Sequence, residues 1–132
     1  MAAGTVLVDS SFYIGLARNG QDPLQALAYA AVDRDLAVCG IVRCEVARGI
    51  RQPKVLKNFQ AFWNVMVNVP TDDRLWSSVE ELAWRLDRQG NTLPLTDIVI
   101  ACCALRIDAT VLTFDHHFEL IPELRYTDRI PD

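Results

Sequence analysis

The sequence predicts an α/β fold in which helices cover both faces of a mainly parallel sheet, a three-layer α/β/α sandwich. Short apolar segments of strand length alternate with longer segments of helical periodicity along the whole chain. Acidic residues follow two of the predicted core strands, at the edge where open α/β sheets bind ligands. No repeat, low-complexity tract or long linker interrupts the 132 residues, so we expect a single domain spanning 1–132.

Two strands and three helices are expected in the first part of the chain. They are a strand at 5–8, a helix capped by Ser10 or Ser11 that runs through Arg18, a helix opened by Pro23, a strand at 36–39, and a helix from Ile41 to Arg48. Asn19-Gly20 and Gly49 supply helix stops. We expect the helix after Pro23 to bury one apolar face, composed of Leu24, Leu27, Ala28 and Ala31.

The second part continues the alternation. The expected elements are a helix opened by Pro53, a strand near 65–69, an amphipathic helix after Pro70-Thr71 that ends at Gly90, a helix from Thr96 to Ile107, a strand at 110–114 and an edge strand at 124–126. Thr96 is the expected N-cap of its helix. This helix is apolar on nearly every side, so we expect it to be central or to lie at an interface.

Composition limits the class of protein. No apolar run reaches the roughly 20 residues that span a bilayer, and the start Met1 to Gly4 lacks the basic residues of a signal peptide. We therefore expect a cytoplasmic protein without a membrane anchor. The four cysteines show no C-x-x-C spacing and lie in apolar stretches, which is typical of reduced, buried thiols. A net charge of −4 argues against a generally basic nucleic-acid coat.

Four acids, Asp9, Glu45, Asp97 and Asp115, lie beside otherwise apolar segments. Each has an ordinary structural interpretation. Asp9 can cap the helix after its strand, Asp97 suits a helix first turn, Asp115 suits a turn, and Glu45 can pair with Arg48 one helical turn away. Taken together, the four acids favour a shared site. Two of them follow strand ends, one lies on an inward helix face and one lies at a helix N-terminus, and these places can converge on one crevice.

Converging carboxylates predict a divalent cation. Two like charges about 4 Å apart repel by about 4 kcal/mol at an effective dielectric constant of about 20, so such groups hold protons or bind a cation. Hard oxygen ligands favour Mg²⁺ or Mn²⁺ over zinc. An ion of this kind can activate water for attack on a phosphodiester, so the chemistry predicts a metal-dependent hydrolase. A zinc site formed by cysteines with His116 and His117 remains an alternative.

Four segments carry a resemblance to a known family. Val6-Leu7-Val8-Asp9-Ser10-Ser11, Cys44-Glu45-Val46-Ala47-Arg48-Gly49, Leu95-Thr96-Asp97-Ile98-Val99-Ile100-Ala101 and Leu112-Thr113-Phe114-Asp115-His116-His117-Phe118 occur in this order. They resemble the motifs of PIN-domain ribonucleases, and more narrowly of VapC-type toxins of prokaryotic toxin–antitoxin pairs. The resemblance implies a PIN-like fold over the whole chain. One departure is His117, which stands where family members often carry an acid or another polar residue.

The resemblance also implies roles for single residues. Asp9, Glu45, Asp97 and Asp115 are expected to be catalytic and to bind Mg²⁺ or Mn²⁺, with Ser11 and Thr113 as polar support. The expected activity is endoribonuclease cleavage of RNA, and the expected partners are a cognate antitoxin and a second copy of the chain in a homodimer. Apolar surface on the 97–107 helix and on Trp63, Trp76 and Trp84 is a second reason to expect partners.

Three arginines are candidates for RNA binding, and two other functions compete with the nuclease. Arg43, Arg48 and Arg51 near the Glu45 helix are candidates for RNA phosphate contacts, although an ordinary solvated helix face explains them equally well. A catalytically inactive PIN-like module that binds RNA or protein is the alternative function. A response-regulator receiver has a similar layout but needs a lysine after a late strand, and the lysines here are Lys54 and Lys57.

Overall fold

The computed structural model describes residues 4–131, in which a central sheet of five parallel strands is covered by helices on both faces. The strands are β1 (Val6–Val8), β2 (Leu36–Cys39), β3 (Val67–Val69), β4 (Thr110–Leu112) and β5 (Tyr126–Thr127). Their spatial order is β3-β2-β1-β4-β5, with β1 at the centre. Most of the Met1 to Gly4 start lies outside the described residues.

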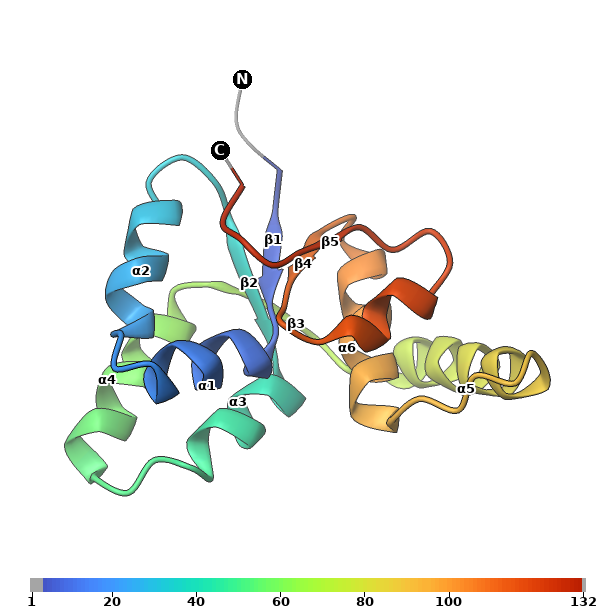
Figure 1. Ribbon diagram of the computed structural model, residues 1–132, viewed down its shortest axis with the longest axis horizontal. Helices are drawn as coiled ribbons and strands as arrows, with labels where there is room; N and C mark the ends of the chain where they lie inside the picture. Colours follow the sequence, from blue (N-terminus) through green and yellow to red (C-terminus); the bar gives the residue numbers. More distant parts are fainter. Residues whose placement is uncertain (1–3, 132) are drawn as a thin grey trace.

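The helices form the two outer layers of a three-layer sandwich, as predicted. They are α1 (Ser10–Arg18), α2 (Pro23–Ala30), α3 (Gly40–Ala47), α4 (Pro53–Asn64), α5 (Asp73–Arg88) and α6 (Leu95–Arg106), followed by the short 3₁₀ helix η1 (His116–Leu120). Figure 1 shows α1 to α4 on one side of the sheet and α5 and α6 on the other. None of the helices within residues 4–131 is long and apolar enough to cross a membrane.

The sheet is an apolar core element whose register brings two strand ends together. Residues of β1, β2 and β4 are almost all buried, as expected for parallel strands covered on both faces. Val8 of β1 pairs with Leu112 of β4, and the backbone N–H of Asp9 donates to the carbonyl of Leu112 at 2.9 Å. The residues that follow these two strands therefore emerge side by side at one edge of the sheet.

The α6 helix is covered inside the domain. Its residues from Asp97 to Ala104 are all buried, and it packs on the sheet and against the apolar face of α5, which is formed by Leu75, Val79, Leu82 and Leu86. The Arg106 guanidinium at its end donates to both carboxylate oxygens of Asp72 at 2.8 and 2.7 Å, and this ion pair joins the two helices. The apolar character of α6 thus reflects a central position within the domain.

The three tryptophans that were expected to contribute apolar surface differ in exposure. Trp63 is buried, with its ring centroid 5.4 Å from that of Phe59 and 6.0 Å from that of Tyr13. Trp76 and Trp84 on α5 are 50% and 61% exposed. The expectation of excess apolar surface is therefore wrong for Trp63 and for most of α6, and it holds for the outer face of α5.

Local predictions were wrong at a few helix ends and faces. Asp9, and not Ser10 or Ser11, is the N-cap of α1, and α6 begins at Leu95 after Pro94, so Thr96 lies in its first turn. The α2 helix buries Pro23, Leu27 and Ala30, whereas Ala28 and Ala31 are exposed. An alanine-rich segment carries a weak hydrophobic pattern, so packing against neighbours selects its buried face.

Candidate active site

The four predicted acids lie at the carboxyl-terminal edge of the sheet, on four different elements. Asp9 follows β1, and Asp115 follows β4 and caps η1. Glu45 lies on α3, directly after β2, and Asp97 lies in the first turn of α6. This is the edge at which parallel α/β sheets bind ligands, because the connecting loops and helix N-termini gather there.

Asp9 is the most buried of these acids and has two unlike oxygens. Its Oδ2 accepts hydrogen bonds from the Ser11 hydroxyl at 2.7 Å and the Thr113 hydroxyl at 2.9 Å, and a long one from the Ser11 backbone N–H at 3.4 Å. Its Oδ1 is buried and has no hydrogen-bond partner among the described residues. Asp9 caps α1 as its ordinary interpretation predicts, but capping uses only one oxygen and leaves the other uncompensated.

Ser11 and Thr113 lie against Asp9, where the resemblance implies polar support. The Thr113 hydroxyl accepts the backbone N–H of Asp115 at 2.9 Å, and the Ser11 hydroxyl accepts the backbone N–H of Phe114 at 3.0 Å. Each hydroxyl has one proton, and accepting these N–H groups leaves that proton free to point at Asp9. The two hydroxyls therefore fix both the Asp9 carboxylate and the backbone that carries Asp115.

Gly15 permits the close approach of the segment between Thr113 and Asp115. A Cβ atom at this position of α1 would lie 2.7 Å from a ring carbon of Phe114, well inside van der Waals contact. The Phe114 ring also lies beside Phe12, with centroids 5.0 Å apart. Gly15 thus lets the residues that flank the β4 acid pack directly on α1.

Glu45, expected as a fourth metal ligand, lies outside the group of potential ligands formed by Asp97, Asp115 and His117. Its Oε1 accepts a hydrogen bond from the Ser10 hydroxyl at 3.0 Å, and the half-buried side chain borders a groove along α1 and α3. The described residues include no ion pair between Glu45 and Arg48, the ordinary explanation considered for this acid. Through Ser10, Glu45 is tied to the strand end that carries Asp9.

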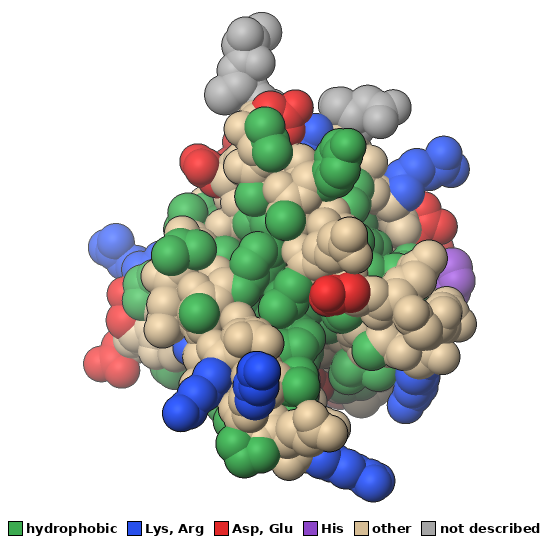
Figure 2. All heavy atoms as spheres, turned by 90° about the vertical axis from the view of Figure 1, so that its left-hand side faces the viewer, with side chains coloured by type: hydrophobic (Ala, Val, Ile, Leu, Met, Phe, Trp, Pro, Cys, Tyr) green, Lys and Arg blue, Asp and Glu red, His purple; other side chains and the backbone are tan. Residues whose placement is uncertain are grey.

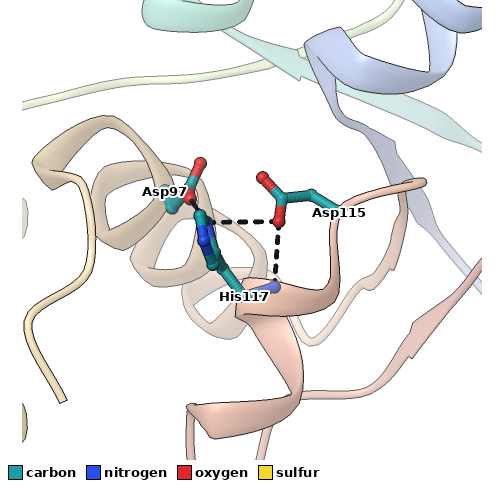
Figure 3. A group of neighbouring side chains, drawn as sticks. All are labelled: Asp97, Asp115 and His117. Carbon is teal, nitrogen blue, oxygen red and sulfur yellow. Dashed lines mark hydrogen bonds and ion pairs between the residues drawn. The ribbon is translucent and has the colours of Figure 1, made fainter.

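Asp97 and Asp115 converge on His117, a residue that was not among the expected Mg²⁺ or Mn²⁺ ligands. The His117 Nδ1 atom lies 2.8 Å from Asp97 Oδ2 and 3.2 Å from Asp115 Oδ1 (Figure 3). One potential ligand atom from each of the three residues falls within 4.8 Å of the others. The tight turn explains this, since Asp115 caps η1 by accepting the His117 backbone N–H at 2.9 Å, which turns the imidazole back toward the carboxylates.

The electrostatics of this cluster follow from burial and from like charges. Burial raises the pKa of Asp97, and the nearby carboxylates of Asp115 and Asp9 raise it further, against the opposing hydrogen bond from His117. The same hydrogen bond to Asp97 is the main cause that raises the pKa of His117. The fold therefore gathers more negative charge than its own donors compensate, which suits a bound cation.

The donor set fits a divalent metal held mainly by oxygen. Asp97, Asp115 and His117 form a group of potential ligands, and the buried, unpartnered Asp9 Oδ1 lies at the adjoining strand end. The alternative zinc site does not appear in residues 4–131: the cysteines are free, Cys39, Cys102 and Cys103 are buried, and none joins a group of potential metal ligands. His116 likewise stays outside the group.

The predicted arginines separate into two environments. Arg48 and Arg51 line the groove along α1, α3 and α4. Arg43 donates instead to Asn64 and Asn68, each at 3.1 Å, and its guanidinium stacks over Trp63 at 5.3 Å from the ring centroid. The structure therefore places Arg48 and Arg51 beside Glu45 and holds Arg43 in another contact.

A family comparison matches most of this architecture. The PIN domain model matches residues 6–124, a range that includes all four acids and every strand of the sheet except β5. The chain belongs to the PIN domain family. This membership replaces the receiver interpretation, which the lysine positions had already weakened. A search of curated proteins finds no match.

Solved structures with the same PIN fold share little sequence with this chain. VapBC from Salmonella typhimurium, bound to DNA, superposes with a TM-score of 0.77 at 19% identity, covering 95% of this chain and 98% of that one. VapBC-1 from nontypeable Haemophilus influenzae gives 0.74 at 21% identity, covering 94% and 97%. The sarcin-ricin-loop-cleaving toxin VapC20 of Mycobacterium tuberculosis gives 0.65 at 14% identity, covering 96% and 99%. The likeness shows a shared fold over nearly the full length.

Proposed function

We propose that this PIN protein is a divalent-metal-dependent endoribonuclease of the cytoplasm and the toxin of a type II toxin–antitoxin pair. The observation that carries the proposal is the Asp9 carboxylate, buried with one oxygen unpartnered beside a strand end that presents Asp115. A buried carboxylate oxygen without a donor is costly unless a cation completes its environment. VapC20, which has the same fold, is described as cleaving the sarcin-ricin loop, and this supports RNA as the substrate class.

The residues of the candidate site would have different roles in the proposed reaction. Asp9, Asp97 and Asp115 would hold the ion, and Ser11 and Thr113 keep Asp9 oriented through its other oxygen. Glu45, held by Ser10, faces the groove from which substrate would arrive. When bound, Mg²⁺ or Mn²⁺ would polarise the phosphodiester and lower the pKa of the attacking water. Cleavage by water leaves a 5′-phosphate and a 3′-hydroxyl, because the 2′-hydroxyl of RNA takes no part.

A groove beside Glu45 is the surface on which we propose that RNA and the antitoxin bind. It has a volume of about 900 Å³ and lies among α1 to α4, with the apolar residues Ile14, Leu24, Val46, Ile50, Val55 and Phe59 in its walls. Arg18, Arg48 and Arg51 also line it. Figure 2 shows hydrophobic side chains gathered across this face with Lys and Arg side chains next to them. Apolar walls suit a helical antitoxin segment, and the arginines suit RNA phosphates.

Cleavage of RNA in the presence and absence of metal tests the activity. We expect cleavage with Mg²⁺ or Mn²⁺, none in excess EDTA, and a loss of at least about 100-fold in Asp9→Asn, Glu45→Gln, Asp97→Asn and Asp115→Asn, since removal of residues that merely support metal ligands already costs about 10- to 100-fold. Asp128→Asn is the control, because Asp128 is exposed and lies outside the group of potential metal ligands. Undiminished cleavage in EDTA, or in any two of the four variants, contradicts the metal site; RNA binding without cleavage supports the inactive module.

Two assemblies belong to the same proposal. A similar structure, VapBC-5 from Mycobacterium tuberculosis, is described as a member of the VapBC family of toxin-antitoxin systems. This supports a cognate antitoxin whose arginine could reach the acidic cluster. The exposed Trp76 and Trp84 on α5 support a homodimer. Sedimentation of the chain alone, then with an antitoxin peptide, tests both. A strict monomer at high micromolar concentration contradicts the dimer, and cleavage undiminished by saturating peptide contradicts inhibition through the groove.

A further inference from the structure

His117 is placed as a metal ligand would be, although its side chain is not buried. Its imidazole is 48% exposed, so packing does not force it onto the carboxylates. The η1 turn and the bond from its backbone N–H to Asp115 aim it there. His116, the neighbouring residue, is exposed and has no place in the cluster. The two histidines thus form a natural pair, one inside the site and one outside.

The distances around Nδ1 match the spacing of atoms that share one metal ion. Adjacent ligands of an octahedral ion with bonds of about 2.1 Å lie about 3.0 Å apart. Nδ1 lies 2.8 Å from Asp97 Oδ2 and 3.2 Å from Asp115 Oδ1, on either side of that value. A single N–H on Nδ1 can point well at only one of the two oxygens, whereas a shared cation satisfies all three atoms at once.

A second, independent observation points to the same ion. Asp9 is 2% exposed, and its Oδ1 has no partner among the described residues. Asp9 is linked to the cluster through one hydroxyl, since Thr113 lies 2.9 Å from Asp9 Oδ2 and 2.9 Å from the Asp115 backbone nitrogen. The strand ends therefore bring a buried, unsatisfied carboxylate to the residues that surround Nδ1.

We propose that His117 Nδ1 is a ligand of the metal centre and that this nitrogen makes the centre select Mn²⁺ over Mg²⁺; this rests on the proposed function. Imidazole nitrogen binds first-row transition ions more strongly than it binds Mg²⁺, which prefers oxygen ligands and keeps its water. The carboxylates of Asp9, Asp97 and Asp115 retain affinity for a hard ion such as Mn²⁺. A site of three carboxylates and one imidazole therefore differs from an all-oxygen site in which ion it prefers.

The simpler alternative is an ion pair in which a protonated His117 takes the place of a cation. The two interpretations make opposite predictions for removal of the side chain. A ligand lost from the centre weakens Mn²⁺ binding, whereas a competing positive charge lost from between two carboxylates strengthens the binding of any divalent ion. Mn²⁺ binding to a variant without this imidazole therefore separates them.

Metal binding in the absence of RNA tests the proposal. Tag-free wild type, His117→Ala, His117→Asp and the matched control His116→Ala are titrated with Mn²⁺ and with Mg²⁺ by calorimetry, and the Mn²⁺ complexes are examined by pulsed electron paramagnetic resonance. We expect ¹⁴N coupling to Mn²⁺ in wild type and His116→Ala and none in His117→Ala. His117→Ala should lose at least about tenfold in Mn²⁺ affinity with little change for Mg²⁺. His117→Asp should bind Mg²⁺ more tightly than wild type.

Each contrary result has a defined meaning. Mn²⁺ bound by wild type without ¹⁴N coupling, or bound more tightly by His117→Ala, overturns the ligand role of His117 and leaves the proposed nuclease in place. A wild-type chain that binds neither ion overturns both this inference and the metal-dependent function. Loss of the ¹⁴N coupling in His116→Ala as well as in His117→Ala would contradict the assignment of the bound nitrogen to His117.

Discussion

The site is built from two halves that stabilise their carboxylates by different means. In the hydroxyl half, formed by Asp9, Ser10, Ser11, Glu45 and Thr113, neutral hydroxyl groups donate to the acids. In the imidazole half, formed by Asp97, Asp115 and His117, one side chain that can itself carry charge faces two carboxylates. The hydroxyl half is therefore oriented by neutral donors that leave only Asp9 Oδ1 for a cation, whereas the arrangement of the imidazole half depends on which positive charge occupies it.

Removal of the Thr113 hydroxyl should produce the largest loss of stability, because it is the buried link between the halves. Thr113→Val deprives Asp9 of a donor and the Asp115 backbone N–H of its acceptor. We expect urea unfolding without metal to show a loss of about 1–3 kcal/mol, as for buried groups left unsatisfied. Thr127→Val, which removes a half-buried hydroxyl bonded to Arg129, is the control. Equal losses in the two variants would remove the special role of Thr113.

Loss of the Ser10 hydroxyl should have a smaller effect within the same half. Ser10→Ala removes the donor to Glu45, but water can replace it because the Glu45 side chain is only half-buried. The expected cost is about 0.5–1.5 kcal/mol in the same urea experiment, with weaker metal binding by calorimetry. Ser78→Ala, whose hydroxyl bonds to a backbone carbonyl on the surface of α5, serves as the control. A loss larger than that of Thr113→Val would reverse the ranking of the two hydroxyls.

In the imidazole half, neutralising Asp97 should cost no stability at all without metal. The raised pKa of Asp97, caused first by burial, means that the fold disfavours its ionised form, so wild type loses stability as the pH rises through this pKa. Asp97→Asn should therefore melt at or above wild type at neutral pH, and the difference should vanish only as the pH falls below the ordinary carboxyl pKa that Asp97 has in the unfolded chain. Thermal melts across pH, with and without Mn²⁺, measure this.

The response to metal provides the complementary measurement for Asp97. Mn²⁺ or Mg²⁺ at about 100 times its dissociation constant adds about 2.7 kcal/mol to a protein that binds it only when folded. Wild type and Asp128→Asn should show an increase in melting temperature, and Asp97→Asn should lose most of it. A metal-free Asp97→Asn that melts well below wild type would show that its bond to His117 outweighs the cost of crowded charge.

Most of the fold could be predicted because the periodic segments are long and consistent with one another. The strand end at Asp9 and the helix of Glu45 lie where apolar runs stop and helical spacing begins. The start of α6 was predicted two residues late, since Thr96 has a capping side chain but Pro94 already ends the preceding extended segment. The edge strand β5 was expected at 124–126 and forms at Tyr126–Thr127, because pairing with β4 selects its register.

The acids of the candidate site could be chosen from the sequence, and its imidazole could not. Asp9, Glu45, Asp97 and Asp115 interrupt apolar segments, which is a signal that sequence carries. His117 lies in a single 3₁₀ turn, where spacing alone does not tell which of two adjacent histidines points inward. The one available signal was the separation from Asp115, since a capping Asp accepts the backbone N–H two residues on and so holds His117 beside it. The environment of Arg43 could not be predicted from the sequence either, because its contacts with Asn64, Asn68 and Trp63 form only in the folded protein.

The central position of β1 has a consequence for synthesis of the protein. This strand is made first, yet it gains its partner β4 only after more than a hundred residues have been added, as the bond between Thr113 and Asp9 across 104 positions shows. Contacts between residues so distant in the chain form slowly, and on a ribosome they wait for the later segment to emerge. Asp9 therefore stays without Asp97, Thr113 and Asp115 until the later segment that carries them has emerged from the exit tunnel, so a nascent chain cannot assemble the acidic site before that point.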